Sequence, residues 1–466
     1  MISFNPGDEN VVVPSGLFDR YSVPGPRYTS FPPVPDWGAG FSATDHAIAL
    51  GRARKPLSIY VHVPFCRNRC LYCGCNVTIS KDEARAERYL DSLERELDLV
   101  AEHLLGDLPA VQMHWGGGTP TFLTPAQVER LANAIRARFR LTGDAECGVE
   151  VDPRVTSREH LRVLRLSGFN RLSIGVQDFD PAVQHAVRRV NPPEMVRDLV
   201  EEARRLGFRS INMDLMYGLP HQTVESMAVT LSEVVAIRPD RVAMFGYAHL
   251  PQRFRHQRAL RESAMLTGED RAGLFAQAIT RLTDSGWRFI GLDHFALPED
   301  DLAQAHAAGA LRRNFMGYTT HAETDLLAFG ASAISELSSA YAQNHRSIPE
   351  WAAAVDAGSL ATVGGHTLYA EDLVRREIIM ELLCNSRCVR SRIERAHPDW
   401  FGSREFDVAF APEIGRLADL LDDELVTDDG ETITVTAMGR LFVRNIAMCF
   451  DPMRDQRCSG ELQRTA

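Results

Sequence analysis

Residues 57–76 read LSIYVHVPFCRNRCLYCGCN, an apolar run that leads into four cysteines within ten residues. The run 57–63 is typical of a buried β-strand, because it is short and rich in β-branched and aromatic residues. Cys66, Cys70 and Cys73 follow with the spacing C-x3-C-x2-C, and Cys75 comes two residues later. In a reducing compartment, such a cluster indicates metal binding or catalysis rather than disulfides.

A strand-then-helix alternation continues from this first strand. The predicted strands are 57–63, 110–115, 147–152, 170–176, 210–217 and 241–247. Helical patterns between them include 124–139, with Thr124 as cap and Pro125 at its first position, and 157–168 and 193–207, which end at Gly168 and Gly207. A helix after each strand predicts parallel pairing, with the site at the carboxyl ends of the strands.

The pattern of predicted strands and helices suggests three regions in the 466 residues. Residues 1–50 are rich in Pro and Gly and are expected to form an extended arm without its own core. Residues 51–300 carry the strand–helix alternation. Residues 301–466 are expected to be mostly helical, with a short β-wing near 431–445.

Charge and hydropathy exclude some classes of protein. The net charge of −11 argues against a large nucleic-acid footprint, but it leaves room for a local basic pocket. No apolar run approaches the roughly 20 residues of a membrane helix. The start MISFNPGDENVVV lacks the pattern of a secretory signal, so a cytoplasmic protein is expected.

The cysteine spacing suits an iron–sulfur cluster. Three thiolates on one loop can each bind one iron of a cubane, and the open fourth iron can bind an amine and a carboxylate. The methionyl end of S-adenosylmethionine (SAM) carries both groups. A structural zinc site normally uses two separated pairs of ligands, so the crowded spacing disfavours zinc. A cluster of free, structural cysteines is the third interpretation.

Polar residues at the predicted strand ends are further candidates for the site. Gly116–Gly118 could let the backbone approach a ligand, although a tight turn would also explain them. Glu150 could bind an ammonium group or a ribose diol, and Asp214 interrupts an otherwise apolar strand. Asp152 lies on the same face as Glu150 and could bind such groups too, although a capped turn before Pro153 would also explain these carboxylates.

The loop CRNRCLYC resembles the signature of the radical SAM superfamily. A longer ordered set of motifs is similar to the oxygen-independent coproporphyrinogen III oxidase family, from about Arg27 to Asp451. These motifs are CGCN, PRYTSFP, HWGGGTPT, VEVDP, NRLSIGVQDF, MDLMYGLP, YAHLP, DHFA, NFMGYTT and GRLFVRNIAMCFD.

The resemblance implies an α/β fold, a partial (β/α)6 radical SAM barrel with a smaller, mostly helical C-terminal domain. It implies a 4Fe–4S cluster bound by Cys66, Cys70 and Cys73, with Cys75 not a ligand. It also implies two SAM molecules. The residues matching one SAM site are Tyr60, Gly117, Glu150 and Ile334, and those matching the other are Tyr72, Gly118, Thr119, Gln177, Arg189, Asp214 and Ala248.

The implied reaction is the oxidative decarboxylation of two propionates of coproporphyrinogen III to vinyl groups, giving protoporphyrinogen IX. The cluster and SAM would carry the chemistry, so no side chain is assigned a catalytic role. The implied partners are the tetrapyrrole and a one-electron donor such as a flavodoxin or ferredoxin. A monomer is expected, without nucleic-acid binding or membrane insertion.

Two alternatives remain at this point. Relatives of the family bind haem without oxidase activity, but they generally lack the CGCN cysteine and the PRYTSFP arm that are present here. A radical SAM enzyme acting on another tetrapyrrole is also possible, because Met316 stands where Gln is expected. Tyr72 stands where many relatives have Phe, and an aromatic stack on adenine survives that change.

Overall fold

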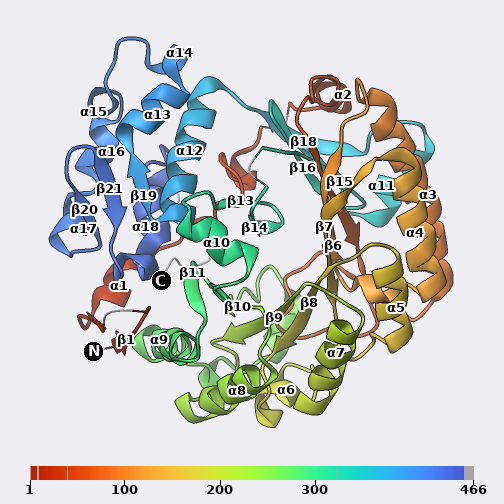
Figure 1. The fold of residues 1–466 in the computed structure, drawn as a ribbon, viewed down its shortest axis with the longest axis horizontal. Coiled ribbons are helices and arrows are strands. Elements are labelled where there is room, and N and C mark those ends of the chain that lie inside the picture. The colour runs from red at the N-terminus through yellow and green to blue at the C-terminus, as the bar shows by residue number, and fades with distance from the viewer. Residues whose placement is uncertain (1, 8–9, 39, 322, 456–466) are drawn as a thin grey trace.

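The computed structural model describes residues 2–7, 10–38, 40–321 and 323–455. Its main sheet curves into an arc with helices along the outside (Figure 1). Within the described residues, this sheet has twelve strands in the order β11-β12-β10-β9-β8-β7-β6-β3-β15-β16-β17-β18. The strands predicted from sequence form its centre: β3 (Leu57–Val63), β6 (Ala110–Gly117), β7 (Leu141–Val151), β8 (Arg171–Gln177), β9 (Ser210–Tyr217) and β10 (Arg241–Gly246).

These central strands pair in parallel, as predicted. The helices that follow them are α3 (Glu83–His103), α4 (Pro125–Arg138), α5 (Arg158–Leu166), α6 (Pro181–Ala186), α7 (Pro193–Arg205), α8 (Val224–Ile237) and α9 (Gly268–Asp284). Thr124 caps α4 in a capping box with Gln127. Gly168 and Gly207 follow α5 and α7 with φ of 86° and 85°, which confirms the predicted helix ends.

The sheet does not end near residue 300. β15 (Asp325–Phe329) pairs in parallel with β3, and β16 (Ile334–Leu337), β17 (Ala340–Asn344) and β18 (Thr362–Thr367) extend that edge. The other edge carries β12 (His294–Ala296) and β11 (Arg288–Gly291). The expectation of a mostly helical chain from residue 301 is therefore corrected for residues 301–367, because strands β15 to β18 of that segment belong to the main sheet.

The helical region begins with α12 (Ala370–Asn385). It continues through α13 (Arg390–Ala396), α14 (Pro398–Phe401), α15 (Phe406–Ala409), α16 (Ala411–Gly415), α17 (Ala418–Asp422), η5 (Gly439–Phe442) and α18 (Val443–Met448). The expected β-wing is present as β19 (Arg387–Val389), β21 (Thr432–Val435) and β20 (Val426–Asp428), in that order. In chain order, α10 (Asp301–Ala307), β13 (Arg312–Asn314) and β14 (Gly317–Thr319) precede β15, and α11 (Ile348–Asp356) lies between β17 and β18 and packs on α3.

The N-terminal arm is more structured than expected. It forms β1 (Ile2–Phe4), β2 (Val11–Val13), α1 (Leu17–Tyr21), η1 (Val34–Asp36) and α2 (Ala43–Gly51). Its aromatic side chains pack on other parts of the chain, with the Phe18 ring 5.1 Å from that of Phe442 and Trp37 stacked at 5.2 Å on Tyr341. The arm thus packs against both the helical region and the sheet. None of the described helices is both long and apolar enough to span a membrane.

Candidate active site

The cysteine loop leaves β3 at its carboxyl end and is closed at its base by a short pair of strands. β4 (Phe65–Cys66) runs parallel to β5 (Thr78–Ile79), and the Ser80 N–H donates to Cys66 O over 3.0 Å. Because β3 is a central parallel strand, the cysteines lie at the carboxyl edge of the sheet, where βα folds build their sites.

A pocket of about 180 Å³ lies between this loop and strands β6 to β9. All three predicted cluster ligands line it, and so does Cys75. Eight predicted SAM contacts line the same pocket: Tyr72, Gly117, Gly118, Thr119, Glu150, Gln177, Arg189 and Asp214. Residues far apart in the sequence therefore converge on one small space.

Three predicted SAM contacts are not among the residues that line this pocket. The Tyr60 ring lies parallel to that of His114 at 6.3 Å, behind Glu150. Ala248 O accepts a 3.4 Å hydrogen bond from the amide of Gln257. Ile334 lies on β16 and pairs with Gln343.

The three cysteines differ in their surroundings. The guanidiniums of Arg154 and Arg189 each donate to Cys70 Sγ over 3.5 Å. Burial raises the pKa of Cys66 to about 11, and iron coordination would displace that proton. A hydrogen bond from Cys75 lowers the pKa of Cys73 to about 6.

The cysteines are not arranged as the ligands of a single metal ion would be. Among the described residues, no group of three or more His, Cys, Asp or Glu side chains is placed to hold one metal ion. The three cysteines instead surround a shared space. The chemistry of this donor set fits a 4Fe–4S cluster, in which each thiolate binds a different iron.

A buried ion-pair network of Asp152, Arg154 and Arg189 supports Cys70, and of these three residues only Arg154 was not predicted from the sequence. Asp152 Oδ2 lies 2.6 Å from Arg154 Nη2 and 3.0 Å from Arg189 Nη1. Burial alone would raise the pKa of Asp152, but Arg189 and Arg154 hold it below its usual value. Arg154 could have been found as a cation two residues beyond a carboxylate at a strand end.

The glycine triplet lets β6 approach both β3 and Glu150. A Cβ at Gly118 would lie 2.9 Å from Val63 O at the end of β3, and one at Gly116 would lie 2.8 Å from Glu150 Oε1. Gly117 has φ of 105°, and its N–H donates to Glu150 Oε2 over 3.2 Å. The close approach found here is therefore to the protein's own backbone and carboxylate.

Two carboxylates of the pocket have different electrostatic surroundings. Burial would raise the pKa of Glu150, but a hydrogen bond from His114 lowers it. Burial, with a smaller effect of the Glu150 charge, raises the pKa of Asp214 to about 7. Asp214 accepts hydrogen bonds from Asn212 Nδ2 at 2.7 Å and Ser173 Oγ at 3.1 Å.

Comparison with known proteins agrees with this geometry. Residues 60–234 match the radical SAM superfamily. The chain is 43% identical over 442 residues to the oxygen-independent coproporphyrinogen III oxidase of Escherichia coli K12, covering 95% of each chain. It is also 43% identical over 440 residues to that of Pseudomonas aeruginosa, covering 93% of this chain and 95% of the relative.

A solved structure of the Escherichia coli coproporphyrinogen III oxidase, described as a radical SAM enzyme, superposes with a TM-score of 0.89 at 42% identity. That match covers 95% of this chain and 99% of the other. The barrel and the cysteine pocket thus define a radical SAM enzyme. Within that superfamily, the chain belongs to the oxygen-independent coproporphyrinogen III oxidase family.

Proposed function

We propose that this chain is an oxygen-independent coproporphyrinogen III oxidase of haem biosynthesis, which converts two propionates to vinyl groups and gives protoporphyrinogen IX. The observation that carries this proposal is the full-length likeness to enzymes of that name, at 43% identity over 95% of the chain. The three thiols around one pocket support it independently.

Cys66, Cys70 and Cys73 would hold the 4Fe–4S cluster. A bound, reduced cluster would supply the electron for the cleavage of SAM to methionine and a 5′-deoxyadenosyl radical. Arg154 and Arg189 donate hydrogen bonds to the Cys70 sulfur, and such bonds help to set a cluster's reduction potential.

The carboxylates at the strand ends would orient SAM. Glu150 and Asp214 can accept hydrogen bonds from an ammonium group or from ribose hydroxyls. Tyr72 can stack on adenine, and Gln177 offers an amide at the same pocket. We propose that two SAM molecules bind. Tyr60, Ala248 and Ile334, which do not line the pocket, would also contact SAM.

Each turnover would convert one –CH2–CH2–COO⁻ group. The β-carbon would lose a hydrogen atom to the 5′-deoxyadenosyl radical, which becomes 5′-deoxyadenosine; the carboxylate would leave as CO2, and one electron would pass to an external acceptor. The remaining two carbons form the vinyl group. Two turnovers use two SAM molecules and two electrons from the donor.

The electron donor would dock beside the cysteine loop. His256 Nε2 lies 2.7 Å from Cys73 O, and Gln257 Nε2 donates to Tyr72 O over 3.0 Å. The segment that carries these contacts has exposed arginines, which we call the donor face: Arg253, Arg255, Arg258 and Arg261. In a chain of net charge −11, this local positive charge suits a negatively charged flavodoxin or ferredoxin.

Reversing the charge on the donor face is expected to slow reduction of the enzyme by a protein donor, but not by a small-molecule reductant. The variant Arg253→Glu/Arg255→Glu should reduce the rate with a flavodoxin donor by at least about tenfold at low salt, because steering is lost. The rate with dithionite should not change. The control Arg52→Glu/Arg209→Glu alters exposed arginines near the amino ends of β3 and β9. Equal loss with both reductants would contradict a docking role.

The function itself is tested by an anaerobic assay. The protein is reconstituted with iron and sulfide, its cluster is verified by EPR, and SAM, reductant and coproporphyrinogen III are added. Mass spectrometry should show two CO2 released per protoporphyrinogen IX formed. Absence of SAM-dependent CO2 release would refute the proposal, and stoichiometric haem binding with intact SAM would favour the haem-binding relatives instead.

A further inference from the structure

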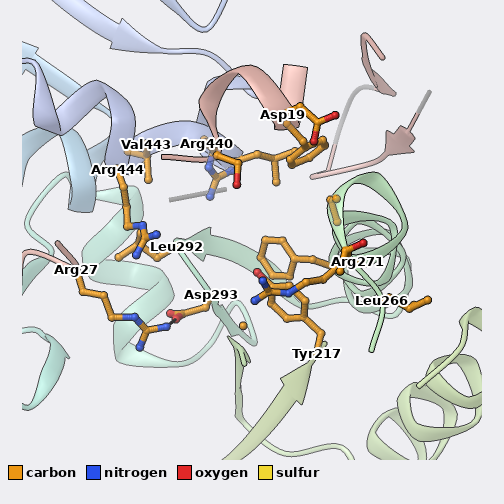
Figure 2. Close-up of a pocket in the computed structure, with 18 of the residues that line it drawn as sticks. Asp19, Arg27, Tyr217, Leu266, Arg271, Leu292, Asp293, Arg440, Val443 and Arg444 are labelled. Carbon is orange, nitrogen blue, oxygen red and sulfur yellow. Dashed lines mark ion pairs between the residues drawn. The ribbon is translucent and has the colours of Figure 1, made fainter. Parts of the chain in front are cut away.

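A second and larger cavity, of about 510 Å³, lies where the N-terminal arm, α9 and the helical region meet. Its volume is within the range of roughly 300–1,000 Å³ that is usual for ligand pockets. Figure 2 shows charged side chains from separate elements directed into this space. Among the described residues, none lines both this cavity and the cysteine pocket.

The cavity is strongly positive. Two aspartates, Asp19 and Asp293, line it with five arginines: Arg27, Arg271, Arg313, Arg440 and Arg444. The Asp293 carboxylate already has two partners. Its Oδ1 lies 2.6 Å from His294 Nδ1, and its Oδ2 lies 3.6 Å from Arg27 Nη2. The residues that line the cavity therefore carry three more positive than negative charges, although the net charge of the whole protein is negative.

Several guanidinium donors of the cavity are buried without a partner. The Nε of Arg271, the Nε and Nη1 of Arg313 and the Nε of Arg440 are buried and make no hydrogen bond within the described chain. Leaving such donors unsatisfied inside a protein is energetically unfavourable, and more so for charged groups. Burial also lowers the pKa of Arg440 to about 10. An anionic ligand would satisfy these donors.

The rest of the cavity wall is apolar and aromatic. Arg271 lies over the Tyr217 ring at 5.3 Å, and that ring stacks on Phe275 at 5.1 Å (Figure 2). Phe18, Leu266 and Leu441 complete the apolar part. The complementary ligand therefore has an apolar body and several anionic groups. Arginine forks match carboxylates bidentately, which favours carboxylates as those groups.

The cavity lies close to the cysteine pocket along the sheet. Tyr217 ends β9 three residues after Asp214, and at about 3.3 Å per residue the two positions are about 10 Å apart along the strand. Side chains three residues apart point to opposite faces of a strand, so one ligand with several carboxylate arms would reach both spaces across the carboxyl end of β9.

We infer that this arginine cavity binds propionate carboxylates of the tetrapyrrole that are not reacting, while the reacting propionate enters the cysteine pocket. The inference rests on the proposed function, because it takes its ligand from that function. It assigns Arg271 and Arg313 to substrate binding.

The test measures binding of coproporphyrin III to the reconstituted enzyme under nitrogen, by fluorescence quenching. Arg271→Gln and Arg313→Gln should each weaken binding about 10–100-fold, because a charge-assisted hydrogen bond is lost. The tetramethyl ester of the same porphyrin carries no carboxylate and should bind all proteins weakly and equally. The control Arg209→Gln changes an exposed arginine at the start of β9 and should bind like the wild type.

Two further readouts separate binding from structural roles. Without porphyrin, the Gln variants should melt at the same or a higher temperature than the wild type, because each removes buried N–H donors that have no partner. Their SAM cleavage with dithionite alone should be unchanged. If a Gln variant does not fold, the Arg→Lys variant at that position is measured instead and should show a smaller loss of binding.

The outcomes for the cavity and for the function are distinct. Unchanged coproporphyrin affinity in both variants, with an active wild type, would overturn the arginine cavity and leave the function standing. A lower melting temperature with unchanged affinity would assign the arginines to structure alone. A wild type that binds coproporphyrin but releases no CO2 would overturn the function.

Discussion

Replacing Cys66, Cys70 or Cys73 with Ala is expected to remove the cluster and to abolish CO2 release. Each thiolate would bind a different iron, so none of the three can substitute for another. Without the cluster, the enzyme loses its means of cleaving SAM, and we expect the rate to fall by more than about 10⁶-fold. Iron and sulfide content, visible absorbance and product mass spectrometry measure the effect.

Cys75→Ala is the matched control for these variants. Cys75 lines the same pocket and is exposed, and its hydrogen bond lowers the pKa of Cys73. The variant should keep most of its iron, because three ligands remain. If Cys75→Ala loses iron completely while Cys66→Ala retains it, the assignment of ligands is wrong.

The cysteine loop and the central strands could be predicted because their signals are local. The apolar run at β3 and the spacing of Cys66, Cys70 and Cys73 lie within twenty residues, and caps such as Thr124 act within one helical turn. Parallel pairing then follows from the alternation of strands and helices, which brings Glu150 and Asp214 to one edge of the sheet.

The late strands of the sheet could not be recognised in the same way. β15 and β16 are five and four residues long, so each is too short for a clear period-2 pattern. β15 takes its position from pairing with β3, which lies more than 250 residues earlier in the chain, and β16 pairs in turn with β15. Non-local pairing of this kind leaves little trace in a single sequence.

The residues of the arginine cavity could not be predicted from the sequence either. Sequence reasoning expects a basic pocket for a substrate with several carboxylates, but it cannot choose the arginines. Arg27, Arg313 and Arg440 come from the N-terminal arm, β13 and η5, and only the tertiary fold brings them to one space. Arg154 was missed for a different reason, because its role depends on the direction of its side chain toward Cys70.

Asp214→Asn is expected to stabilise the SAM-free enzyme at pH 8 and to impair catalysis. Burial raises the pKa of Asp214 to about 7, so the folded protein holds this proton more tightly than the unfolded chain does. The stability from the protonated carboxyl is fully present below about pH 4 and is lost as pH rises through about 7. At pH 8 the charged group costs at most about 4 kcal/mol, which Asn avoids.

Thermal unfolding without SAM should therefore show a higher melting temperature for Asp214→Asn than for the wild type at pH 8. The two proteins should converge toward pH 4, where the wild-type carboxyl is protonated. Asn cannot offer a charged acceptor to ribose hydroxyls, so SAM affinity should fall about 10-fold or more. Asp198→Asn, an exposed site on α7, should change neither property. A melting difference that does not vary with pH would show that the Asp214 charge is not what opposes folding, whereas unchanged SAM affinity would remove this carboxylate from the binding site.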